Sequence, residues 1–227
     1  GKSDTPEYIQ VIGGPHTASG GMIGKELSNT FENSNFYDPD KNRESNLKYD
    51  LNDGITMEFW MLKPSGSLMT GSTDMEIPVM LSNEISGTAG VGIFTTSPTD
   101  PAALRMFFFV ASGSVMVSTN DAVGFPIKND DIFDGRWHHY AFSAKNTDSN
   151  INLKGYFDGD LVYDQDIAGN MSEVTGALKL NVGAGRKEAV GPAGIFPSDG
   201  YGKLSGSIYE FRFWKTQRTS EEIGRYW

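Results

Sequence analysis

The chain has 227 residues, of which 29 are acidic and 19 are basic, and its formal net charge is −10. A surface of that sign repels phosphate backbones, so the composition argues against nucleic-acid binding. The absence of cysteine excludes disulfide bonds and thiolate metal sites, and the longest apolar run, from Met106 to Ala111, is too short to cross a bilayer.

The beginning of the chain gives no targeting information. Gly1-Lys2-Ser3 does not open a basic segment followed by an apolar stretch, so we expect no signal peptide in these residues. The length suits one β-sandwich, and no internal repeat or linker divides the sequence. We therefore expect residues 1–227 to form a single domain that has been excised from a larger protein.

Short strands separated by clusters of Gly, Asn, Asp, Ser and Pro run along the whole chain, which is typical of an all-β protein. The predicted strands are 8–12, 47–51, 55–62, 78–82, 90–95, 104–111, 114–118, 137–145, 151–157, 161–166, 177–183 and 207–215. About a dozen strands with so little helix predict two packed antiparallel sheets. The segments 65–74 and 185–202 have the composition of long loops, where binding residues often lie.

Two of these strands, one turn and one short helix give more specific expectations. Residues 106–110, within the strand 104–111, are apolar on both faces, so we expect them to be buried on both, and an exposed face there would mark a protein interface. Alternation within 207–215 places Tyr209, Phe211 and Phe213 on one face and Glu210 and Arg212 on the other, where the last two would form an ion pair. In addition, Asp158-Gly159 predicts a tight hairpin, and the Thr219–Glu222 spacing predicts a capping box at the start of a short helix.

Four motifs occur in an order that resembles a known family. They are an aromatic-Trp strand in 56–61, the D-G-x-W-H-H run of 134–139, the F-D-G hairpin of 157–159, and a final strand and helix in 206–223. This order resembles the laminin-G-like (concanavalin A-like) jelly-roll family, over roughly residue 47 to the end. The resemblance implies an all-β, two-sheet antiparallel jelly-roll sandwich.

The final motif departs from the family at two positions. Ser220 stands where the helix motif has Leu, and Tyr209 stands where the last strand often has Asp, so any role of that Asp cannot be transferred. The Arg-Thr form of the final helix is similar to modules of bacterial surface proteins and phage structural proteins. By that analogy alone, the chain would bind glycans or decorate a particle.

Oxygen-bearing side chains alternate in one acidic loop near the N-terminus. Asp38, Asp40, Asn42 and Glu44 could all turn toward one hard cation, and members of this fold often bind calcium near their N-terminal loops. The loop lacks the Gly and the distal Glu of an EF-hand. The prediction is a calcium site, and the alternative is a solvated acidic turn. Asp130, Asp131 and Asp199 are weaker candidates.

Aromatic side chains are the candidates for sugar binding, because sugars stack their apolar ring faces on Trp and Tyr. Trp60 and Trp137 lie in family-pattern strands, so we expect them to pack in the core. Trp214 shares the face of Glu210 and Arg212, so we expect it to be exposed. The predicted ligand-binding residues are Trp214, Tyr201, Asp199 and Arg186, the last three in the long loop that also carries Phe196. A plain surface loop is the alternative.

No catalytic residues are predicted. His138 and His139 are adjacent in a strand and point to opposite faces, so they cannot share a metal or act as one base. Glu58 stands alone in its strand, unlike the paired acids of glycosidases. The run 201–209 resembles the Tyr-x-Lys strand of polyuronate lyases only faintly, because its Gly is one place late and its Gln is missing.

The resemblance and the missing catalytic pairs predict a non-catalytic carbohydrate-recognition or adhesion module of an extracellular, cell-surface or virion protein. Its partners would be a glycan or polysaccharide and the other domains of the larger protein, with calcium as a cofactor and no membrane insertion. Two alternatives stay open: a purely structural module that decorates a capsid or fibre, and a polysaccharide lyase or hydrolase.

Overall fold

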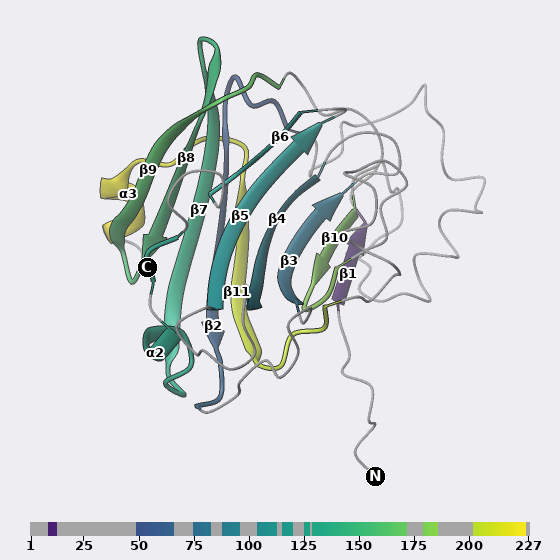
Figure 1. Ribbon diagram of the computed structural model, residues 1–227, viewed down its shortest axis with the longest axis vertical. Coiled ribbons are helices and arrows are strands. Elements are labelled where there is room, and N and C mark those ends of the chain that lie inside the picture. Colours follow the sequence, from purple (N-terminus) through teal and green to yellow (C-terminus); the bar gives the residue numbers. More distant parts are fainter. Residues whose placement is uncertain are drawn as a thin grey trace, which may run out of the picture.

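Two antiparallel β-sheets pack face to face in the computed structural model (Figure 1). The structure describes residues 9–12, 49–65, 75–82, 88–95, 104–112, 115–119, 125–127, 129–171, 179–185 and 202–225. This arrangement is the all-β, two-sheet jelly-roll sandwich that the sequence predicts.

The first sheet has six strands in the order β1-β10-β3-β4-β5-β6. These strands are β1 (Ile9–Ile12), β3 (Met75–Ser82), β4 (Thr88–Thr95), β5 (Leu104–Ser112), β6 (Val115–Ser118) and β10 (Lys179–Val182). The second sheet has five strands in the order β11-β2-β7-β8-β9. They are β2 (Ile55–Leu62), β7 (Trp137–Thr147), β8 (Asn150–Phe157), β9 (Asp160–Ala168) and β11 (Ser207–Trp214), and the helices are α2 (Asn129–Ile132) and α3 (Ser220–Arg225).

Most predicted strands are confirmed within a few residues, and two elements differ. The strand predicted over 47–51 is wrong where the structure describes it, because Tyr49 makes a single bridge and Leu51 already lies in a turn. Its chain reverses there through backbone hydrogen bonds from Asp53 and Gly54 to the carbonyl of Asp50. The sequence did not predict α2, which is a single short turn of helix.

The core fills the space between the two sheets. Phe142 of β7 lies at its centre, with ring centroids 6.3 Å from Phe59, 5.6 Å from Phe108 and 5.0 Å from Phe125. Phe59 belongs to the same sheet as Phe142, whereas Phe108 belongs to the opposite one. Aromatic contacts of this kind stabilise the packing beyond the burial of area alone, so they join the layers firmly.

Strand β5 is buried on both faces, as its sequence predicts. Its even-numbered side chains, such as Phe108, face the other sheet, and Phe107 and Phe109 face outward yet are also buried. The two outward rings lie over Gly92 and Gly90 of β4, where an added Cβ would meet the rings at 2.3 and 3.0 Å. Glycine at these two positions therefore makes room for the phenylalanines.

The predicted hairpin joins β8 to β9 through two residues. Asp158 and Gly159 both have positive φ, 48° and 83°, which is the backbone of a type I′ turn. Before the turn, Gly155 lies directly under the ring of Phe125, and a Cβ there would come within 1.8 Å of the ring. The turn and this close approach together fix the position of β8 in the sheet.

A β-bulge interrupts the last strand and overturns one prediction. Tyr209 pairs with Trp60, but the next paired residue is Arg212, opposite Glu58, so the register shifts between them. Glu210 sits in the bulge with φ of 49°. The extra residue turns Tyr209 to the outer face of the sheet, beside Arg212, whereas alternation placed it on the opposite face.

Helix α3 covers part of this outer face, over β7 and β8. Its Ile223 is fully buried against Ala141 and Tyr156, and the Tyr156 hydroxyl lies 3.3 Å from the Ser220 hydroxyl. In Figure 1 the helix lies beside β8 and β9. In the described chain, no helix is long and apolar enough to cross a membrane.

Candidate functional site

Three aromatic residues gather on the outer face of the five-stranded sheet, and we call them the aromatic face: Trp60 of β2, Trp137 of β7 and Tyr209 of β11. Tyr209 pairs across the sheet with Trp60, and Trp137 pairs with Leu62 of β2. Because β2 lies between the other two strands, the three aromatic side chains are close neighbours. They project away from the core because residues alternate between the two faces of a strand.

The aromatic face is open to solvent. Tyr209 is 62% exposed and Trp137 is 44% exposed. Their ring centroids lie 6.4 Å apart with the planes at 70°, so one ring meets the edge of the other. The prediction that Trp60 and Trp137 pack in the core is therefore wrong, because the register of β2 and β7 directs both away from the opposite sheet. Only Trp60 is partly buried, beside the His139 ring at 5.5 Å.

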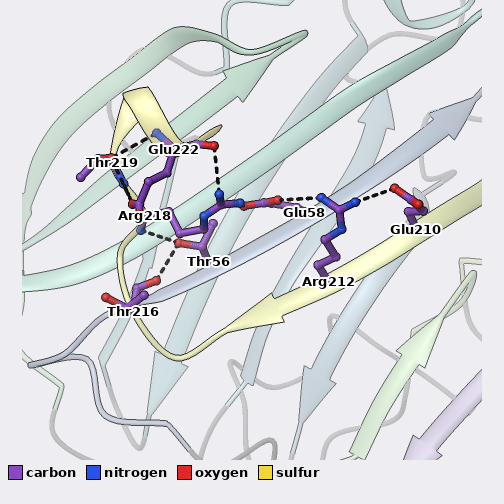
Figure 2. A network of polar contacts seen from close by, with 8 residues as sticks. All are labelled: Thr56, Glu58, Glu210, Arg212, Thr216, Arg218, Thr219 and Glu222. Carbon is purple, nitrogen blue, oxygen red and sulfur yellow. Dashed lines mark hydrogen bonds and ion pairs between the residues drawn. The ribbon is translucent and has the colours of Figure 1, made fainter. Parts of the chain in front are cut away.

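Four alternating charges continue along the same outer face, and we call them the charged row: Glu210, Arg212, Glu58 and Arg218. Figure 2 shows them in that order. Arg212 forms an ion pair of 2.7 Å with Glu210 and lies 3.9 Å from Glu58, which also binds Arg218. The predicted ion pair between Glu210 and Arg212 is thus confirmed.

Glu58 is the buried centre of the charged row. Its carboxylate is almost fully buried and accepts a hydrogen bond from Arg218, which also donates to the Glu222 carbonyl at 2.9 Å. The Arg218 backbone N–H donates to the Thr56 hydroxyl at 3.0 Å. A carboxylate held between two guanidinium groups stays fixed in place, so Glu58 is built into the fold.

The start of α3 is fixed by the predicted capping box. The Thr219 backbone N–H donates to the Glu222 carboxylate at 2.8 Å, and the Glu222 backbone N–H donates to the Thr219 hydroxyl at 3.2 Å. This reciprocal pair satisfies two N–H groups that a helix start would otherwise leave free. It also holds Arg218, the preceding residue, at the edge of the sheet.

Trp214 lies at the far end of the charged row from the aromatic face. It pairs with Thr56 on the outer face, is 40% exposed, and carries the Arg218 guanidinium 4.6 Å from its ring centroid. The prediction that Trp214 is exposed on the Arg212 face is confirmed. A cation above an aromatic ring is attracted by the ring electrons, so Arg218 holds the indole in one orientation.

Most predicted site residues lie outside the described chain. These are the ligand-binding candidates Tyr201, Asp199 and Arg186, and the metal candidates Asp38, Asp40, Asn42 and Glu44. Within the described residues, no three His, Cys, Asp or Glu side chains come together in a way that could hold a metal ion. The predicted calcium site therefore stays a prediction.

The two histidines occupy opposite environments, as their adjacency predicts. His138 lies between two carboxylates, 2.7 Å from Asp158 and 3.2 Å from Asp134. Its burial opposes protonation, but these carboxylates outweigh it and raise the pKa of His138. His139 points to the outer face under Trp60 and is nearly buried, and burial, with a contribution from Arg212, lowers its pKa to about 4.

The sequence reasoning missed Trp137 and Tyr209 as surface residues. Tyr209 was placed on the wrong face because a bulge cannot be read from alternation alone. Alternation could not place Trp137 either, because it relates neighbouring residues to each other and does not say which of them faces the core.

The comparisons with known proteins support the fold. No protein family matches the sequence, and no curated protein matches it either. Among solved structures, the chain is similar to a heptameric SAP-like pentraxin from Limulus polyphemus, with 12% identity, a TM-score of 0.51, and coverage of 78% of this chain and 70% of the pentraxin chain.

Two further structures are similar at lower scores. Domains LG4-5 of the mouse laminin alpha1 chain show 12% identity and a TM-score of 0.49, over 76% of this chain and 38% of the laminin chain. Domain 4 of an extracellular arabinanase from Geobacillus stearothermophilus, solved with arabinotriose, shows 16% identity and a TM-score of 0.42, over 78% of this chain and 66% of that chain. The chain thus spans well under half of the laminin chain it matches.

The strand order, the packing of the two sheets and the similarity to the pentraxin all concern the same backbone arrangement. The chain therefore has a two-sheet jelly-roll fold similar to that of the pentraxin.

Proposed function

We propose that this protein is a non-catalytic carbohydrate-recognition module. The observation that carries the proposal is the solvent-exposed pair of Trp137 and Tyr209 on a rigid sheet. Sugars present apolar ring faces that stack on aromatic side chains, and their hydroxyls bind nearby charged or amide groups. Here Glu210 and Arg212 stand beside the rings on the same face.

The rigidity of the site favours binding. All three residues of the aromatic face lie on strands that are hydrogen-bonded to one another, so little conformational entropy is lost when a ligand stacks on them. A Trp or Tyr that is exposed on a strand also exposes apolar area to water, and a ligand that covers this area is favoured. The arabinanase domain, which is similar to this chain at a low score, was solved with arabinotriose.

The non-catalytic part of the proposal rests on the carboxylates of this face. Glycosidases need two carboxyl groups facing the same bond, one of them free to give a proton. Glu58 is buried between Arg212 and Arg218, and Glu210 is paired with Arg212. Within the described residues, the aromatic face therefore offers no such pair of free acids.

We further propose that the module is extracellular and acts within a larger surface or virion protein. The acidic balance of the chain suits a soluble surface domain that avoids nucleic acids. The Arg218-Thr219 form of the last helix resembles modules of bacterial surface and phage structural proteins. This resemblance supports a surface or virion protein as the larger protein.

A glycan array tests the proposal directly. The labelled protein, with millimolar calcium in the buffer, is expected to bind a defined group of glycans. Trp137→Ala and Tyr209→Ala should each weaken the binding by about tenfold or more, because exposed aromatic anchors dominate such interfaces. Leu161→Ala is the matched control, since Leu161 is a 42% exposed apolar residue on β9 of the same sheet, away from the aromatic face.

Two results would contradict the proposal. If no glycan on the array binds, the protein is not a carbohydrate-recognition module. If Trp137→Ala and Tyr209→Ala both bind as tightly as the unaltered protein, the aromatic face is not the binding site. If the protein instead forms an oligomer that protects Trp137 and Tyr209 from solvent, and binds no sugar, the structural-module alternative takes its place.

A further inference from the structure

We infer that the ligand is a neutral oligosaccharide that lies along β11, stacking at the aromatic face and again at Trp214, with the charged row between the two positions. The inference rests on the proposed function and adds the class of sugar, the direction in which it lies and a second contact position. It follows from the order of side chains on the outer face of β11 and β2.

The two stacking positions are too far apart for one sugar ring. Tyr209 lies opposite Trp60, and Trp214 lies opposite Thr56, four residues further along β2. At about 3.3 Å per residue this separation is roughly 13 Å. A ligand that reaches both positions must therefore contain several linked sugar rings, and a single terminal sugar would use only one of them.

The charged row between these positions is electrically balanced. It contains two carboxylates, Glu58 and Glu210, and two guanidinium groups, Arg212 and Arg218. An anionic sugar would meet the exposed Glu210 carboxylate and would find the arginines already paired. Sugar hydroxyls both donate and accept hydrogen bonds, so the Glu210 carboxylate can accept from one hydroxyl and the Arg212 guanidinium can donate to another.

The bulge at Glu210 places Tyr209 and Arg212 on the same face of the sheet. Without the extra residue, Tyr209 and Arg212 could not both lie on the outer face, because they are three positions apart. With it, Tyr209, the Glu210–Arg212 pair and Trp214 all contribute to one side of the sheet. Since Arg218 fixes the Trp214 ring, this second position is also held ready for a ligand.

The test is an array that carries neutral oligosaccharides of increasing length beside sialylated, sulfated and uronate-containing glycans. We expect binding to neutral chains, stronger for longer ones, and little weakened by added salt, because no net charge is involved. Trp214→Ala should lower affinity for long chains to that for short ones while leaving short chains bound as before. Glu210→Gln and Arg212→Gln should each lower affinity about tenfold.

The matched controls are Glu221→Gln and Arg225→Gln, which alter an exposed Glu–Arg pair on α3. They should bind like the unaltered protein, and thermal unfolding should show that every variant is folded. Preference for acidic glycans, loss of binding in salt, or equal losses for short and long chains in Trp214→Ala would overturn the inference while leaving carbohydrate binding in place. If the array shows no binding at all, the proposed function itself is rejected, and if binding survives both Trp137→Ala and Tyr209→Ala, the aromatic face is rejected as its site.

Discussion

His138 and His139 are adjacent in β7, but their environments move their pKa values in opposite directions. Asp158 contacts both residues: its carboxylate lies 2.7 Å from the His138 ring and accepts the His139 backbone N–H at 2.8 Å. The two carboxylates beside His138 stabilise its charged form, and burial destabilises the charged form of His139. The two residues should therefore have opposite effects on how stability depends on pH.

The lowered pKa of His139 makes the fold sensitive to acid. Above about pH 6.5 both the folded and the unfolded state carry a neutral His139 ring, so the contribution of this ring to the unfolding free energy is fully present. As the pH falls from 6.5 toward 4, the unfolded state takes up a proton before the folded state does, and this contribution is lost. We expect His139→Gln to reduce the loss of unfolding free energy between neutral pH and about pH 4 by at most about 3 kcal/mol. Urea unfolding at a series of pH values measures this difference.

His138→Gln is the companion variant with the opposite sign. Because the pKa of His138 is raised, its stabilisation is fully present below the pKa of the unfolded chain and is lost as the pH rises through the folded pKa. The variant should therefore lose more stability at acidic pH than at alkaline pH. Parallel pH profiles for the unaltered protein and for both variants would refute the assignment of opposite shifts.

At the scale of elements, Glu58 and Arg218 join the middle of the sheet to the start of α3. Removing one member of a buried ion pair leaves the other charge without its partner, which costs about 3–5 kcal/mol. We expect Glu58→Gln to lower the unfolding free energy by that amount. Chemical denaturation, followed by tryptophan fluorescence, gives the value.

A double variant separates the pair from its surroundings. Glu58→Met with Arg218→Met replaces both charges by apolar side chains of similar length, so it should recover much of the loss. Some loss of stability should persist, because Arg218 also donates a hydrogen bond to the Glu222 carbonyl and methionine has no N–H group to replace it. If Glu58→Gln unfolds at the same denaturant concentration as the unaltered protein, the pair does not hold the helix to the sheet.

Elements whose causes are local could be predicted from the sequence. The Asp158-Gly159 hairpin and the Thr219–Glu222 capping box each depend on two residues and the backbone between them, and both are confirmed. The bulge at Glu210 depends on the register with β2, which no local pattern contains. For that reason the strand was predicted correctly, and the face of Tyr209 was not.

At the scale of the whole molecule, the sandwich could be predicted because alternation along many strands and four ordered motifs agree. The outward direction of Trp60 and Trp137 could not, because an aromatic residue in a strand suits either face and only the packing of one sheet on the other decides between them. The charged row likewise brings together residues of β2, β11 and the start of α3, of which Glu58 and Arg218 are 160 positions apart. Its members are each visible in the sequence, but their proximity is a property of the fold.

The calcium site predicted at Asp38, Asp40, Asn42 and Glu44 also concerns the whole molecule, since a ligand that binds only the folded state raises the midpoint of unfolding. We expect millimolar calcium, relative to EDTA, to raise the Tm by several degrees, because for a chain of this size about 1 kcal/mol corresponds to 2–4 °C. Differential scanning fluorimetry measures the shift.

The net charge of −10 makes a control essential, because any divalent cation can screen acidic repulsion. Magnesium at equal concentration should give a smaller shift if a calcium site exists, since it binds flexible oxygen clusters less readily. Asp38→Asn with Asp40→Asn should abolish the calcium-specific part. Asp160→Asn with Asp166→Asn, which neutralises an equal charge at exposed positions of β9, should preserve it. Equal shifts with both metals, or in both double variants, would show that the stabilisation is general screening and that residues 38–44 form a solvated turn.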